Sequence, residues 1–171
     1  SPVRQYNDQV EGQFGLHADV LVVGISSENG IFTPETLGRI ARLTDEVLGL
    51  PGVIARDVVA LSTVNDVTVD RGTLQARPIL DAIPRDQREA ERLKRQVLDN
   101  ALLVNRLASS DGNTTAIYIP IEKSANGKAI AEQIRRIAAR DRGPERYYIA
   151  GDPVARDTFG SEMFRQMGLF S

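Results

Sequence analysis

The side chains that most often carry catalysis are scarce in this chain of 171 residues. It has no cysteine and a single histidine, His17. Thiol nucleophiles, disulfides and metal sites built from thiolates or several histidines are therefore excluded. A serine-type triad needs an acid that orients its histidine, and Asp19 stands too close to His17 along the chain to do so. These residue types favour a protein that is not an enzyme.

Glycine-rich phosphate-binding motifs are absent from the sequence as well. It contains no GxxxxGK[ST], no GxGxxG and no GxSxG pattern, so no phosphate loop or nucleophile elbow is predicted. Asn126-Gly127-Lys128 lacks the first glycine and the hydroxyl residue of a phosphate loop. An acyl-phosphate hydrolase would need an arginine in the loop after the first strand, and residues 26–32 carry Glu28 but no arginine.

Two polar clusters offer ligand atoms without the spacing of a ligand site. Asn65, Asp66 and Asp70 lack the glycine and closing glutamate of a calcium loop, and Asx turns use the same residues. The arginines at positions 135, 136, 140 and 142 are interspersed with acidic residues, which is typical of a solvated helix face. We expect no cofactor and no tightly held metal.

The charge balance and hydropathy limit the classes of partner. Lys plus Arg number 21 and Asp plus Glu number 23, so nonspecific electrostatic binding to nucleic acid is excluded. No stretch reaches the roughly 20 apolar residues that a membrane-spanning helix needs. The chain starts Ser1-Pro2, from which we expect that it belongs to a longer protein.

Strand and helix patterns occur twice along the chain. In the first unit, the apolar run at 20–25 predicts a buried strand. Thr33-Pro34 predicts the start of a helix over 34–48, and a second strand is expected over 53–61. In the second unit, at 114–150, a strand over 114–121 precedes a helix over 128–140 and a short strand over 147–150.

Two β-α-β units of this kind predict an α+β fold, a ferredoxin-like split β-α-β sandwich. Four antiparallel strands in the order 4-1-3-2 would carry both helices on one face. A doubly wound parallel sheet is the competing arrangement, and it normally needs more β-α units. The expected core residues are Val20, Val22, Leu37, Ile40, Val47, Ile117, Ile119, Ile130, Ile134 and Ile137.

The rest of the chain is assigned to one domain over 1–171. An insertion at 62–113 separates the units at 19–61 and 114–150. It is expected to hold a ribbon around Asp70-Arg71-Gly72-Thr73 and a charged helix over 86–99. A polar helix over 2–14 precedes the first unit, and a last helix over 153–171 follows the second.

Several sequence pieces, in order, resemble the first extracytoplasmic loop of resistance–nodulation–division (RND) exporters, in the branch related to the lipid-exporting MMPL proteins. The pieces cover nearly the whole chain, and their set, more than any one of them, carries the resemblance. They are Tyr6-Asn7 to Phe14-Gly15, Asp19 to Val23, Gly30 to Leu37, Leu50 to Val53, Leu61 to Asp66, Pro78 to Asp81, Val97 to Asn100, Leu107, Ser110 to Gly112, Thr115-Ala116 and Ala150 to Val154.

The resemblance implies a porter-type domain between transmembrane helices 1 and 2 of a bacterial inner-membrane protein, on the periplasmic side. The implied function is proton-driven export of lipids or other hydrophobic compounds, with no catalytic residue in this loop. The implied partners are a hydrophobic substrate and the rest of the transporter, including its second porter domain. Contact with the membrane would run through segments outside this chain.

The C-terminal end of the chain is apolar and is the candidate substrate- or membrane-facing surface. Methionine and aromatic side chains make adaptable apolar surfaces. Two other roles stay open, namely packing of the last helix on the sheet and leading into the second membrane helix. The candidate residues are Met163, Phe164, Met167, Leu169 and Phe170.

A free-standing ferredoxin-like module that binds a ligand or regulates a partner is the alternative function, because this fold hosts many unrelated functions. Sequence on either side of the chain discriminates between the two. Apolar stretches of about 20 residues before Ser1 and after Ser171 would favour the exporter, and polar flanks or stop codons would exclude it.

Overall fold

A computed structural model describes residues 19–150, apart from the side chains at positions 66–70 and 75. The expected helices over 2–14 and 153–171, His17 and the five candidate residues near the C-terminus lie outside the described residues. In chain order the described elements are β1 (Asp19–Ser26), α2 (Pro34–Leu48), η1 (Ala55–Asp57), β2 (Asn65–Asp70), β3 (Thr73–Pro78), α3 (Gln87–Leu98), β4 (Thr114–Ile121), α4 (Gly127–Arg140) and β5 (Arg146–Ala150).

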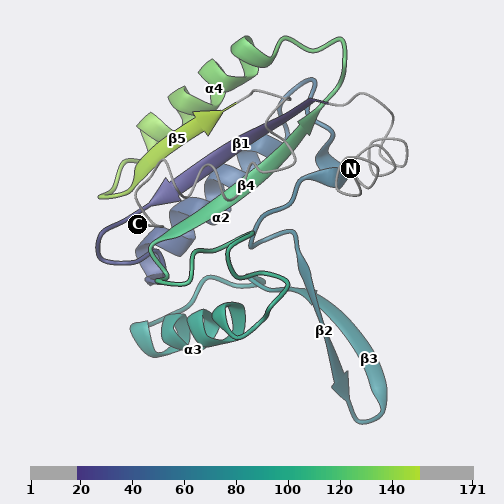
Figure 1. Cartoon of the computed structure of the whole chain (residues 1–171), viewed down its shortest axis with the longest axis vertical. Coiled ribbons are helices and arrows are strands. Elements are labelled where there is room, and N and C mark those ends of the chain that lie inside the picture. Colours follow the sequence, from purple (N-terminus) through teal and green to yellow (C-terminus); the bar gives the residue numbers. More distant parts are fainter. Residues whose placement is uncertain (1–18, 151–171) are drawn as a thin grey trace, which may run out of the picture.

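The main sheet is antiparallel and has the strand order β4-β1-β5. Helices α2 and α4 lie together on one face of it (Figure 1). Because side chains alternate along a strand, Leu21, Val23 and Ile25 point into the core that these helices cover. The predicted α+β class is confirmed, with both helices on one face of the sheet.

Local sequence signals account for where the helices begin. The Thr33 side chain accepts a hydrogen bond from the Thr36 N–H at 3.1 Å, and Pro34 occupies the first turn, so α2 has the predicted bounds. The Asn126 side chain caps α4 in the same way. This helix begins one residue before the predicted position, at Gly127.

The prediction of a strand over 53–61 is wrong. This segment contains the short 3₁₀ helix η1, and it touches the sheet through two isolated antiparallel bridges, Val53 to Ile121 and Val59 to Tyr118. More residues separate Val53 from Val59 than separate their partners on β4. The surplus residues loop out as η1, and this interrupts the ladder. The main sheet of residues 19–150 is therefore three-stranded, not four-stranded.

The insertion contains the expected ribbon and helix. Strands β2 and β3 form a hairpin that closes at Arg71 and Gly72. Helix α3 begins after Asp86, whose side chain accepts a hydrogen bond from the Glu89 N–H. Its apolar face joins the main core, whereas the hairpin extends away from the body of the molecule (Figure 1).

The predicted core is buried with one exception. Val20 is half-buried, because it alternates with Leu21 and lies on the sheet face opposite the helices. Val22 shares that face and is buried there with Ala116 in a small separate cluster. The other predicted core residues pack together under α2 and α4.

Candidate functional site

A hollow of about 970 Å³ opens between the first half of α4 and the nearby ends of the strands. Its apolar lining comes from β1, β4, α4 and β5, through Leu21, Ile121, Ala131 and Ile149. Gly127 lies close to this lining, because a Cβ built there would be 3.4 Å from Ile121 Cδ1. The start of α4 thus approaches the sheet closely. A hollow of this size is within the usual range for small-molecule sites, roughly 300–1,000 Å³.

The polar lining of this hollow carries charges of both signs. Asp19 and Glu132 are acidic, Lys128 and Arg135 are basic, and Arg135 is paired with Glu132 at 2.6 Å. None of the lining residues is a serine, threonine, tyrosine or histidine. The lining can therefore shelter apolar groups, and it holds neither a hydroxyl nucleophile nor a histidine base.

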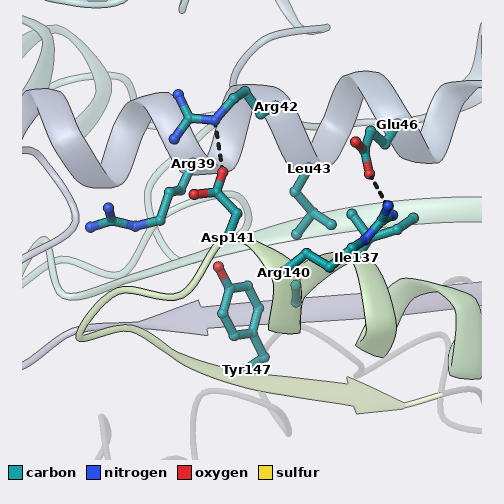
Figure 2. A pocket seen from close by; sticks show the side chains of 9 residues that line it. Arg39, Arg42, Leu43, Glu46, Ile137, Arg140, Asp141 and Tyr147 are labelled. Atoms are coloured by element: carbon teal, nitrogen blue, oxygen red, sulfur yellow. Dashed lines mark hydrogen bonds and ion pairs between the residues drawn. The ribbon is translucent and has the colours of Figure 1, made fainter.

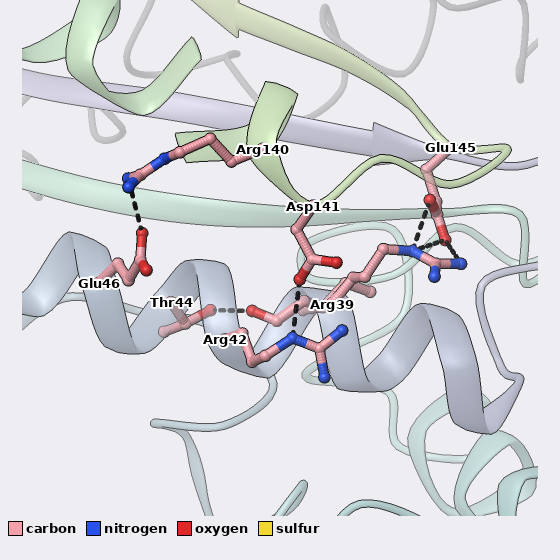
Figure 3. Close-up of polar contacts among 8 residues, drawn as sticks. Arg39, Arg42, Thr44, Glu46, Arg140, Asp141 and Glu145 are labelled. Carbon is pink, nitrogen blue, oxygen red and sulfur yellow. Dashed lines mark hydrogen bonds and ion pairs between the residues drawn. The ribbon is translucent and has the colours of Figure 1, made fainter. Parts of the chain in front are cut away.

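A second feature is the seam between α2 and the segment from the end of α4 to the start of β5, where three arginines each meet a carboxylate (Figure 3). Arg39 is paired with Glu145 at 2.7 Å, Arg42 with Asp141 at 2.7 Å, and Arg140 with Glu46 at 3.3 Å. The last two pairs are exposed, whereas the Glu145 side chain is fully buried.

Glu145 is the most constrained member of this seam. Its carboxylate accepts hydrogen bonds from Nε and Nη2 of Arg39 and from the Thr36 hydroxyl, the last at 2.6 Å. Burial alone would raise the pKa of the Glu145 carboxyl, but the hydrogen bonds from Arg39 and Thr36 outweigh it and lower the pKa below its ordinary value. Glu145 thus stays charged and ties β5 to α2.

The small cavity at this seam, about 200 Å³, is shown in Figure 2. Tyr147 and Leu43 border it together with the arginines, and burial raises the pKa of the Tyr147 hydroxyl. Since Arg39, Arg42 and Arg140 all have carboxylate partners here, their charges are neutralised locally. The seam serves to fasten the elements together, and its arginines do not form an anion site.

The expectations about charged clusters are met only in part. Arg135, Arg136 and Arg140 lie on the exposed side of α4, as expected, but Arg140 also joins α4 to Glu46 of α2. Among the described side chains, no group of three or more His, Cys, Asp or Glu residues lies close enough to hold a metal ion.

Sequence reasoning missed both the hollow and the buried pair. The hollow draws on four separate elements, so no local motif marks it. Arg39 and Glu145 are 106 residues apart. The sequence contains one weak signal for the buried pair. Glu145 is an acidic residue between Gly143-Pro144, which ends the helix, and the strand that follows.

No protein-family model, curated protein or solved structure matches this chain. Within residues 19–150, no helix is long and apolar enough to cross a bilayer. Helix α4 is shared by both features described above, because its first half lines the hollow and its last turn is ion-paired to α2.

Proposed function

We propose that this chain is the extracytoplasmic, porter-type domain of a proton-driven RND exporter of the MMPL-like branch, which moves lipids or other hydrophobic compounds. The observation that carries the proposal is the hollow beside α4, since Leu21, Ile121, Ala131 and Ile149 give it an apolar lining large enough for part of such a cargo. The ordered sequence resemblance supports the same function.

We also propose that the domain is a ferredoxin-like sandwich in which the segment 53–61 takes the place of the fourth strand. The two bridges from this segment to β4 are antiparallel. They support an order of β5, β1, β4 and then 53–61, which matches the 4-1-3-2 arrangement. Helices α2 and α4 are then the crossovers of two split β-α-β units.

In this proposal the domain has no enzymatic activity and contributes a path for cargo. Energy coupling in such exporters depends on acidic residues inside the membrane, which belong to segments outside this chain. The cargo would lie against the hollow, and the C-terminal residues Met163, Phe164, Met167, Leu169 and Phe170 would face the substrate or the membrane. The second porter domain and the membrane segments of the same protein are the partners.

The first test reads the parent gene on both sides of the chain. Apolar stretches of about 20 residues immediately before Ser1 and after Ser171 are expected. Polar flanks or stop codons would refute the exporter and leave the free-standing ligand-binding or regulatory module, which could use the same hollow.

The second test measures export of a hydrophobic fluorescent compound by the parent protein. Ala131→Phe reduces the hollow, and we expect it to lower export several-fold with normal expression. Ala139→Phe, on the exposed side of the same helix, is the matched control and should leave export unchanged. Equal export by both variants, at equal thermal stability, would show that cargo does not use the hollow.

A third test concerns the C-terminal residues. We expect Met163→Ser combined with Phe164→Ser to lower export while expression and thermal stability stay close to wild type. A fall in stability in step with export would assign these residues to packing. Unchanged export would show that cargo passes elsewhere.

A further inference from the structure

The hairpin formed by β2 and β3 stands apart from the main sheet. In the described part of the chain these two strands pair with each other and form their own two-stranded sheet. Figure 1 shows the hairpin extending beyond the rest of the molecule. Isolated two-stranded ribbons are marginally stable in water, so a partner for this ribbon would stabilise it.

Two apolar residues of β3, Leu74 and Ala76, are exposed on this ribbon. Its register sets Val67 opposite Ala76 and Val69 opposite Leu74. Leu74 and Ala76 share one face of β3, because side chains alternate along a strand. Leu74 is 72% exposed, and Ala76 is exposed as well. The intervening positions carry the polar residues Asp66, Thr68, Asp70, Thr73, Gln75 and Arg77.

The turn determines which backbone groups of β3 are free. Arg71 and Gly72 both have positive φ, 52° and 78°, which is the signature of a two-residue type I′ turn. The flanking residues Asp70 and Thr73 then form a hydrogen-bonded pair, and such pairs alternate along the ladder. The N–H and C=O groups of Leu74 and Ala76 therefore point away from β2, along the outer edge of β3.

We propose that β3 pairs with β3 of a second copy of this chain, antiparallel, about a two-fold axis at Gln75. Leu74 of each copy then lies opposite Ala76 of the other, and their outward N–H and C=O groups complete four hydrogen bonds. Leu74 and Ala76 of both copies then lie on one face of a four-stranded ribbon. The inference is independent of the proposed transport function.

Charge favours the β3 edge over the β2 edge for this contact. Pairing through β3 places Thr73 opposite Arg77 of the other copy, with no like charges opposed. The equivalent pairing of two β2 strands about Thr68 would set Asp66 opposite Asp70 twice, which destabilises a sheet. Pro78 is the last residue of β3 and has no N–H to donate. The missing N–H would have pointed away from β2, so the hydrogen bonds within the hairpin are not affected.

A cysteine at the two-fold axis gives a direct test, because the native chain contains no cysteine. In the proposed dimer the two copies of residue 75 are a non-hydrogen-bonded pair with Cα atoms about 4.5 Å apart, within disulfide range. Under mild oxidation the 171-residue chain with Gln75→Cys should become mostly cross-linked dimer.

The matched control is Thr68→Cys, at the position opposite Gln75 on β2. In the proposed four-stranded ribbon the two copies of residue 68 are three strand spacings apart, about 14 Å, which is too far for a disulfide. Cross-linking of Thr68→Cys in preference to Gln75→Cys would overturn the proposal and point to the β2 edge. Equal, slow cross-linking of both would indicate random collision and would also overturn it.

The reversible dimer is tested without cysteines by analytical ultracentrifugation, where the native chain should show a species of twice 18.7 kDa. Ala76→Pro removes an outward N–H of β3, and we expect it to weaken the dimer about 10- to 30-fold, the loss of two hydrogen bonds per dimer. Asn65→Pro, at an outward-pointing N–H on the opposite edge of the ribbon, should leave the dimer intact. A chain that stays monomeric at every concentration, or one that binds lipid vesicles through Leu74 while monomeric, would refute the proposal.

Discussion

Replacing Glu145 with glutamine is expected to weaken the domain far more than any exposed charge change. The Glu145 side chain is 0% exposed, and its partner Arg39 is only 15% exposed. Glu145→Gln keeps the size of the side chain and an oxygen that can still accept from Thr36 or Arg39. It removes the negative charge, so the largely buried Arg39 guanidinium loses the carboxylate to which it is directly hydrogen-bonded.

The structure sets the size of this effect. Removing one partner of a buried ion pair costs about 3–5 kcal/mol. A hydrogen bond that the glutamine retains recovers about 1 kcal/mol. We therefore expect the free energy of unfolding to fall by about 3 kcal/mol. For a chain of this size that corresponds to a fall in Tm of about 6–12 °C.

Urea unfolding followed by circular dichroism measures the change, with Glu46→Gln as the control. Glu46 is paired with Arg140 on the surface, and such exposed pairs contribute no more than about 1 kcal/mol. A loss in Glu145→Gln no larger than in Glu46→Gln would refute the idea that the buried pair holds β5 to α2.

The same variant predicts a pH dependence. The pKa of Glu145 is lowered in the folded chain from an ordinary value of 4.5, so the unfolded chain binds its proton first as the pH falls. The advantage of wild type over Glu145→Gln is therefore complete above about pH 5 and shrinks as the pH falls below 4.5. An advantage that stays constant down to pH 2 would contradict this assignment.

Two further predictions concern a close contact at a glycine and the ionisation of a half-buried tyrosine. Gly52 has φ +88°, and a Cβ there would lie 2.9 Å from the Ala125 Cβ. Gly52→Ala should therefore lower the free energy of unfolding, measured by urea denaturation, by about 2 kcal/mol or more. Gly72→Ala, with similar φ but nothing within 4 Å, should cost only the backbone strain of about 1 kcal/mol. Burial raises the pKa of Tyr118 to about 12. Absorbance titration should therefore show a tyrosine that ionises near pH 12 and is lost in Tyr118→Phe, and stability should fall as the pH rises above 10.

Signals confined to a few residues were enough to predict most of the individual elements. Thr33 and Pro34 specify the start of α2, because a side-chain cap and a preset φ act within one turn. The apolar runs around Val23 and Ile117 specify β1 and β4 in the same local way. The segment 53–61 has strand-forming residues but lacks the ladder, because its register against β4 is interrupted by η1.

Contacts between distant parts of the chain could not be read from such signals. Arg39 and Glu145 are both unremarkable as isolated charged residues, and only the packing of β5 beside α2 buries one against the other. The hollow beside α4 likewise exists because Leu21, Ile121 and Ile149 come from three strands that the sheet brings together. Helix caps and side-chain periodicity depend on residues within one or two turns of each other, so they can be predicted from the sequence. Burial and long-range pairing depend on which surfaces the folded chain packs together, and the tertiary structure alone decides them.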